Sequence, residues 1–214
     1  MLLLLAARTA VAGPPKVEKL SGAPPAGVKP TGGSIDAAYY FADKNGINYV
    51  LFSSKSVRGK PGPGGDPTQG ALLYVDHWVL PAGGKPKSLR AVKDLVEDCA
   101  FSLTSRTHDD AFGVTDLDGD GLAEITFAYE IGCRSDVSPN TLKLIVLENG
   151  TKYILRGTTR IEGDTGGDFT PDPPEARWPK KFLDHAKEVW TATADDSSIP
   201  PGASGATGAN PCGE

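Results

Sequence analysis

The chain has 214 residues and a formal net charge of −5, and 39% of its residues are hydrophobic. This length is enough for one domain with a core of its own. The acidic balance argues against nucleic acid as a partner, because binding to phosphates needs a basic surface. Beyond its first residues the chain has no apolar run near the roughly 18 residues of a membrane-spanning helix, so we expect no transmembrane segment.

Residues 1–12 are similar to the remnant of a secretory signal peptide. A leucine run precedes the small-x-small pattern Ala10-Val11-Ala12, which is typical of a cleavage site before Gly13. Arg8 interrupts the run and no basic segment comes before it, a departure that a start codon assigned too far downstream explains. The alternative is the N-terminus of a cytosolic protein. The pattern favours an exported protein in the periplasm, at the cell surface or in the medium.

Two flanking segments have the composition of unstructured chain. Residues 13–33 are rich in proline, glycine and alanine, and residues 195–214 share this bias. Such segments bury too little apolar surface to offset the entropy lost on ordering. We therefore expect a flexible linker at 13–33, a disordered tail at 195–214, and one folded unit at 34–194 whose core neither flank touches.

Between the flanks, alternating apolar and polar residues predict mostly β-structure. Two Asn-Gly pairs, at 45–46 and 149–150, favour type I′ turns because both residues tolerate positive φ, so each predicts a hairpin. Residues 87–96 do not distinguish helix from strand. The expected strands cover residues 38–41, 47–52, 72–80, 99–103, 112–115, 125–131, 142–147 and 153–155.

One amphipathic helix is expected near the C-terminus. Pro179 suits a first helical turn. Large apolar residues then recur on one stripe at Phe182, Leu183, Ala186, Val189 and Trp190. The predicted fold class is α+β and β-rich, a single antiparallel sheet domain with one C-terminal amphipathic helix packed on a face of the sheet.

An aspartate-rich loop carries the clearest chemical signal in the chain. Residues 116–124 place carboxylates at alternate positions around Gly121, which permits a sharp turn. Calcium prefers six to eight oxygen ligands, and clustered carboxylates repel one another without a cation. The alternative is a polar turn ahead of a strand. The expected calcium ligands are Asp116, Asp118, Asp120, Leu122 through its carbonyl, and Glu124 directly or through a water.

The residues that follow distinguish this loop from an EF-hand. An EF-hand has a bidentate glutamate at its twelfth position, where this chain has Phe127, and period-2 alternation follows instead of a helix. The strand-loop-strand arrangement resembles the aspartate-rich loops of FG-GAP and VCBS-type repeats, which bind calcium in β-propellers. Only one copy is found, and repeat folds need about three, so the resemblance covers the loop chemistry and not a propeller.

The chain contains three cysteines, Cys99, Cys133 and Cys212. In an oxidising compartment Cys99 and Cys133 can pair, and the alternative is two buried free thiols. Cys212 lies in the Gly/Pro/Ser-rich tail and is the odd one out.

A wider resemblance rests on three segments: VTDLD at 114–118, GCRSDVSP at 132–139 and KYILRGTT at 152–159. Together they resemble a family of exported bacterial proteins described as uncharacterised or as surface polysaccharide biosynthesis proteins. The likeness extends more weakly from Tyr49 to the helix at 182–190. It implies a role at the cell surface and a Cys99–Cys133 disulfide, and it names no reaction.

No arrangement in the sequence points to catalysis. His77, His108 and His185 have no recognisable nucleophile nearby, and neither a Gly-x-Ser-x-Gly elbow nor a His-Glu-x-x-His helix is present. Arg134 and Asp136 directly follow the strand after the acidic loop. They can contact a ligand, although a structural ion pair is the more common role of such residues.

We therefore expect an exported, calcium-stabilised, non-enzymatic domain that acts at the cell surface or in the periplasm. Two alternatives stay open. One is an enzyme or accessory factor in surface polysaccharide biosynthesis, with calcium, Arg134 and Asp136 in its site. The other is an adhesion or protein-interaction module. The candidate partners are a surface glycan or an envelope protein.

Overall fold

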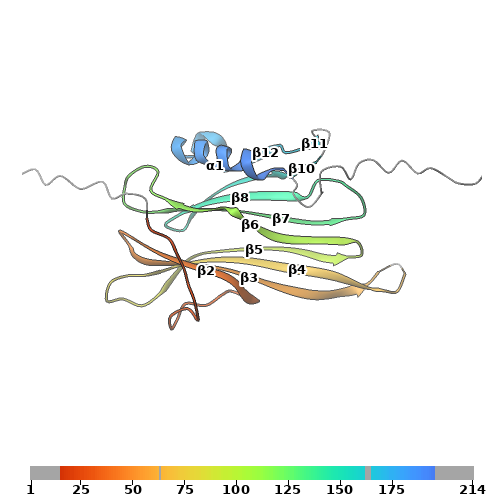
Figure 1. The fold of residues 1–214 in the computed structure, drawn as a ribbon, viewed down its shortest axis with the longest axis horizontal. Helices are drawn as coiled ribbons and strands as arrows, with labels where there is room; N and C mark the ends of the chain where they lie inside the picture. Colours follow the sequence, from red (N-terminus) through yellow and green to blue (C-terminus); the bar gives the residue numbers. More distant parts are fainter. Residues whose placement is uncertain (1–14, 63, 162–164, 196–214) are drawn as a thin grey trace, which may run out of the picture.

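The strands form two facing antiparallel sheets in the computed structural model, which describes residues 15–62, 64–161 and 165–195. Sheet A has the strand order β1-β2-β3-β4-β5, and sheet B has the order β12-β9-β8-β7-β6. Figure 1 shows the sheets as stacked layers, with α1 on the outer side of sheet B. The architecture is a β-sandwich with one helix added to one face.

Sheet A consists of β1 (Glu18–Lys19), β2 (Ser34–Asp43), β3 (Gly46–Pro61), β4 (Pro67–Leu80) and β5 (Lys87–Cys99). Sheet B consists of β6 (Ser102–Thr115), β7 (Glu124–Arg134), β8 (Thr141–Glu148), β9 (Thr151–Thr158) and β12 (Phe169–Asp172). A short ribbon pairs β10 (Arg160–Ile161) with β11 (Thr165–Gly166), and the 3-10 turn η1 (Glu175–Arg177) precedes α1 (Lys180–Thr193).

The β-rich antiparallel class with one helix near the C-terminus is confirmed, and the strands divide between two sheets. The chain crosses from sheet A to sheet B between Cys99, which ends β5, and Ser102, which begins β6. The expected strand at 99–103 is therefore wrong, because that range contains the crossing. The undecided range 87–96 lies within β5. Alternation shows which residues share a face, but it does not show which strands pair.

Both Asn-Gly hairpins form, with different turns. Asn149 and Gly150 adopt φ angles of 43° and 82°, as the predicted type I′ turn requires. At the first hairpin Lys44 and Asn45 make the turn, and Gly46 is the member of the Asn-Gly pair with positive φ, at 128°. The dipeptide predicted the position of this hairpin correctly but not its turn type.

Two apolar layers hold the sandwich together. Ile125, Phe127 and Tyr129 alternate along β7 and face sheet A, whereas Ala128 faces the helix, so both faces of this strand are buried. The predicted helical stripe packs on sheet B, where Phe182, Leu183, Ala186 and Trp190 are buried. Burying one such large side chain contributes roughly 1.5–3 kcal/mol. The helix is therefore an integral part of the domain.

The N-terminal segment packs on the outer face of sheet A, which corrects the expectation of a flexible linker at 13–33. β1 pairs with β2, and Val28 is only 5% exposed where it packs with Tyr49 and Leu51. The carboxylate of Asp76 accepts a hydrogen bond from the backbone N–H of Thr31 at 2.9 Å. Composition misled here because a few apolar residues, Leu20 and Val28 among them, anchor the segment on sheet A although the stretch as a whole is rich in proline and glycine.

Several expectations concern residues outside the described ranges. These are the signal-like residues 1–12, the first part of the linker at 13–14, and the tail from 196 with Cys212. Asp195, the first residue of the expected tail, forms an isolated bridge with Arg160. Among the described residues, no helix is long and apolar enough to cross a membrane.

Candidate metal centre

The acidic loop between β6 and β7 folds around its own backbone. Asp116 accepts hydrogen bonds from the N–H groups of Gly119 (2.8 Å) and Gly121 (3.2 Å). Asp118 accepts one from the N–H of Asp120 at 3.1 Å. The two glycines have φ angles of 81° and 85°, a region that other residues rarely adopt. The loop therefore positions its own carboxylates.

The carboxylates meet in two overlapping groups. One oxygen from each of Asp116, Asp118 and Asp120 lies within 4.8 Å of the other two. The same holds for one oxygen from each of Asp118, Glu124 and Glu148. The structure thus brings together the four carboxylates that the sequence predicted, with Asp118 shared by both groups.

Glu148 is missing from the sequence-based ligand set. It is the last residue of β8 and lies directly opposite Glu124 in the β7–β8 pairing. The sequence shows a glutamate just before the second hairpin turn, but only the register between β7 and β8 places it at the acidic loop. Burial and the charges of four neighbouring carboxylates raise the pKa of Glu148 to about 7. A divalent cation would relieve this repulsion.

Glu124 is fully buried, and its two oxygen atoms differ in their surroundings. Oε2 accepts hydrogen bonds from the N–H of Leu117 (2.8 Å) and the hydroxyl of Thr115 (3.0 Å). Oε1 is buried and has no hydrogen-bond partner among the described residues. Burial raises the pKa of Glu124 in spite of the hydrogen bonds to Oε2. An unpartnered buried oxygen is costly, and a cation shared with Asp118 and Glu148 would satisfy it.

Contacts from the opposite sheet and from the helix hold the loop in place. The backbone N–H of Lys44, in the β2–β3 turn, donates to the carbonyl of Gly121 at 2.9 Å. The Lys44 ammonium donates to the carbonyl of Asp120 at 3.2 Å. Lys181 on α1 donates to the carbonyl of Leu117 at 2.7 Å. The loop therefore connects sheet B to sheet A and to the helix.

All candidate donors at this centre are oxygen atoms. The carbonyl of Leu122 accepts no hydrogen bond from the described part of the chain, so it is free to join the loop carboxylates and Glu148. Calcium takes six to eight oxygens in flexible geometry, whereas magnesium needs near-ideal octahedral geometry and structural zinc favours cysteine and histidine. The residues present fit calcium best.

The other end of β7 carries the disulfide. Cys99 and Cys133 are joined at an S–S distance of 2.05 Å with their Cα atoms 5.5 Å apart, so the predicted pair is formed. The bond links β5 of sheet A to β7 of sheet B. Sequence reasoning identified the pair but not that it connects the two sheets.

Arg134 and Asp136 lie beyond this disulfide and not at the acidic loop. The guanidinium of Arg134 donates to the carbonyl of Ser138 at 2.6 Å. Asp136 accepts from the N–H of Ser138 at 2.9 Å, and the Ser138 contacts lower the pKa of Asp136. Both side chains thus order the β7–β8 loop. Glu130, an acidic residue earlier on β7, pairs with Arg106.

The three histidines make structural contacts. His77 lies 2.9 Å from the side-chain oxygen of Asn48, and His185 lies 3.1 Å from the Thr126 hydroxyl. His108 lies 3.7 Å from Glu130, which is fully buried. None of these contacts joins a histidine to a serine or cysteine nucleophile.

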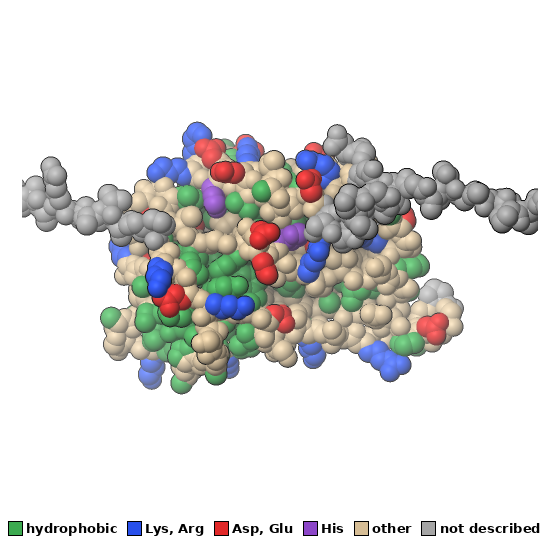
Figure 2. Space-filling model, viewed as in Figure 1, with side chains coloured by type: hydrophobic (Ala, Val, Ile, Leu, Met, Phe, Trp, Pro, Cys, Tyr) green, Lys and Arg blue, Asp and Glu red, His purple; other side chains and the backbone are tan. Residues whose placement is uncertain are grey.

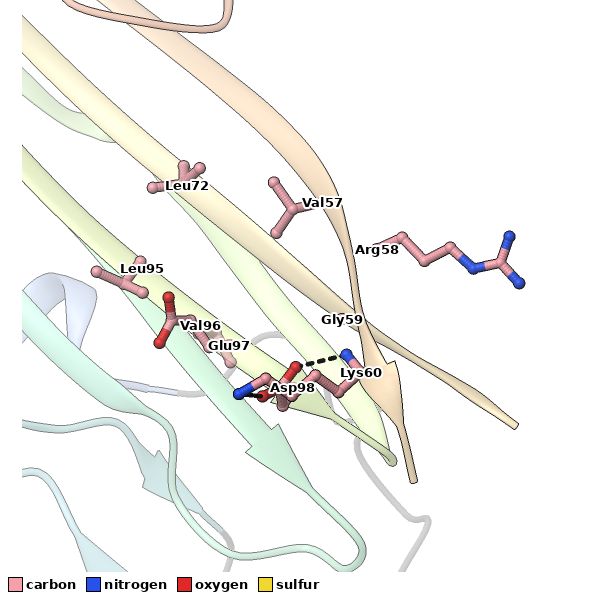
Figure 3. A pocket seen from close by; sticks show the side chains of 9 residues that line it. All are labelled: Val57, Arg58, Gly59, Lys60, Leu72, Leu95, Val96, Glu97 and Asp98. Atoms are coloured by element: carbon pink, nitrogen blue, oxygen red, sulfur yellow. Dashed lines mark hydrogen bonds and ion pairs between the residues drawn. The ribbon is translucent and has the colours of Figure 1, made fainter. Parts of the chain in front are cut away.

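A hollow of about 430 Å³ lies on sheet A near the ends of β3 and β5. Figure 3 shows Val57, Leu72 and Leu95 along its strands, with Lys60 and Asp98 interacting at one end. Its lining includes no histidine, cysteine or serine. On the face shown in Figure 2, acidic and basic side chains are interspersed, so that face offers no continuous basic surface to nucleic acid.

Comparisons with known proteins give no relative: no family model matches the chain, and neither the curated proteins nor the solved structures contain a match.

Proposed function

We propose that this protein is an exported, non-enzymatic domain whose fold is stabilised by calcium, and that it acts in the periplasm or at the cell surface. The observation that carries the proposal is the buried Glu124 carboxylate: its Oε1 lacks a hydrogen-bond partner among the described residues, and one of its oxygens lies within 4.8 Å of oxygens from Asp118 and Glu148. A bound calcium ion would supply the missing partner and the missing positive charge.

The role of the ion would be structural, because the loop it orders contacts three parts of the molecule. Lys44 ties the loop to the β2–β3 turn, Lys181 ties it to α1, and Glu148 belongs to β8. An ion that fixes the loop therefore strengthens contacts among both sheets and the helix. Binding to the folded state alone stabilises that state by an amount that rises with the logarithm of the ion concentration once this exceeds the dissociation constant.

The disulfide supports export. The bond between Cys99 and Cys133 is of a kind that persists in oxidising compartments and is rare in the cytosol. For an extracellular calcium module we expect a dissociation constant on the order of 10⁻⁴–10⁻³ M. The likeness of the loop to FG-GAP-type calcium loops supports the choice of ion.

The test is calcium titration of the full chain by isothermal calorimetry, with thermal unfolding in calcium, magnesium and chelator. We expect heat of binding and a raised melting temperature with calcium. Replacing Asp118 and Asp120 by asparagine keeps an oxygen acceptor for the loop hydrogen bonds but removes two charges, so both effects should vanish. Asp136→Asn is the matched control and should retain them. No heat and no thermal shift in the unaltered protein would reject the proposal.

A further inference from the structure

β5 is the last strand of sheet A, and its edge away from β4 pairs with no described strand. Near its start the β8–β9 turn approaches this edge, because a Cβ on Gly150 would lie 2.8 Å from the Leu89 carbonyl oxygen. Beyond Arg90 no described strand covers the edge, so the backbone groups there are open to another strand. β5 packs over β6 and β7, whereas β9 and β12 lie farther out in sheet B. A strand added to β5 would extend sheet A over the β8–β9 face.

That face of sheet B carries positive charge beside the β5 edge. Lys152 and Arg156 share a face of β9 with Ile154, which is buried between the sheets, because alternate residues of a strand point the same way. Arg90 reaches down from β5 and donates to the carbonyl of Gly150 at 2.7 Å. Arg90 of sheet A therefore lies near Lys152 and Arg156 of sheet B, beside the β8–β9 turn.

Only one of these three cations has an acidic partner among the described residues. Arg156 pairs with Asp172 at 3.2 Å. Within the described ranges, neither Arg90 nor Lys152 forms an ion pair with a carboxylate. Lys152 is half-buried, and its pKa is lowered by burial and by the charges of Arg156 and Arg90. The site therefore has an excess of positive charge that the chain itself does not balance.

We propose that the edge of β5, with Arg90 and Lys152, binds an extended acidic peptide segment of a partner protein. The peptide would pair with β5 through its backbone. Every second side chain would then face sheet B, so acidic residues at alternate positions would meet the two unbalanced cations. Backbone pairing gives the segment its direction and register, and charge complementarity selects acidic sequences.

The first test is fluorescence anisotropy of the full chain with a labelled peptide of alternating Thr and Glu. We expect binding that weakens by about tenfold or more in Lys152→Gln and when Gln replaces Glu in the peptide. Lys93→Gln is the matched control on the same β5 strand, and its affinity should change less than about twofold. Thermal unfolding checks that each variant is folded. No binding of the Thr-Glu peptide would overturn the proposal.

The second test separates strand pairing from simple charge attraction. The Thr-Glu peptide is N-methylated at alternate residues in two registers, so that the methyl groups face β5 in one peptide and solvent in the other. We expect only the first to lose binding. Equal affinity of the two peptides, or full displacement of either by millimolar inorganic phosphate, would show that an oxyanion alone is bound and would overturn the proposal.

Discussion

The two ends of β7 are tied to sheet A by different chemistry. At one end Cys133 is bonded to Cys99 of β5. At the other end Glu124 lies among carboxylates, and the preceding loop contacts the β2–β3 turn at Lys44. The covalent connection needs no ion, whereas the acidic one gathers like charges that the proposed calcium ion would balance. In the proposed function β7 is therefore held constitutively at one end and, through calcium, conditionally at the other.

Removing the disulfide at one end of β7 should change the free energy of unfolding more than any change at the metal end. The bonded cysteines are 34 residues apart in the sequence, and in the chain-entropy model closing such a loop stabilises by about 4 kcal/mol. Replacing Cys99 and Cys133 by serine should lower the free energy of unfolding in guanidinium by about that amount. Cys212→Ser is the control. The calcium-dependent gain should persist in the double variant, and its loss would show that the two ends of β7 are not independent.

Acid should destabilise the fold through His77, a buried residue of β4. Burial lowers the pKa of His77 from 6.5 to about 4, with the charge of Asp43 opposing this shift. Between these values the unfolded chain binds a proton that the folded protein does not, so stability falls as pH decreases. The expected contribution of His77 to this loss between pH 7 and pH 5 is about 2 kcal/mol. The raised pKa of Glu148 acts in the opposite direction in the calcium-free protein, so His77→Gln isolates the histidine contribution. His77→Gln should flatten this part of the pH profile in calcium-free urea titrations, and an unchanged slope would contradict the assignment.

The sequence predicted more of the local chemistry than of the arrangement. Asp116, Asp118 and Asp120 were identified from spacing alone, because the turn that gathers them is local. Glu148 was not, since its position depends on the β7–β8 register. The disulfide pair was predicted, but its role as a link between sheets depends on the crossing after Cys99, which alternation does not reveal.

Glu148 offers a test in which one substitution has opposite effects on the calcium-free stability and on the calcium-induced gain. Its burial among carboxylates destabilises the calcium-free protein, so Glu148→Gln should stabilise that form by about 1 kcal/mol after allowance for solvent screening. With calcium bound, the same change removes a negatively charged ligand and should reduce the calcium-induced gain. Thermal unfolding in chelator and in millimolar calcium measures both. An undiminished calcium-induced gain in Glu148→Gln would place Glu148 outside the site.

Lys44 should give the smallest effect and tests whether the loop is coupled to sheet A. Its ammonium donates to the carbonyl of Asp120 and places a positive charge beside the carboxylates. Lys44→Met should therefore destabilise the calcium-free protein by about 0.5–1 kcal/mol, the usual value of one such hydrogen bond. The calcium-induced gain should then increase, because the ion no longer competes with the ammonium for negative charge. Lys93→Met, on β5, is the control and should leave both quantities unchanged. Paired thermal unfolding curves in chelator and calcium separate the two contributions, and an unchanged calcium-induced gain in Lys44→Met would mean that its charge does not reach the metal centre.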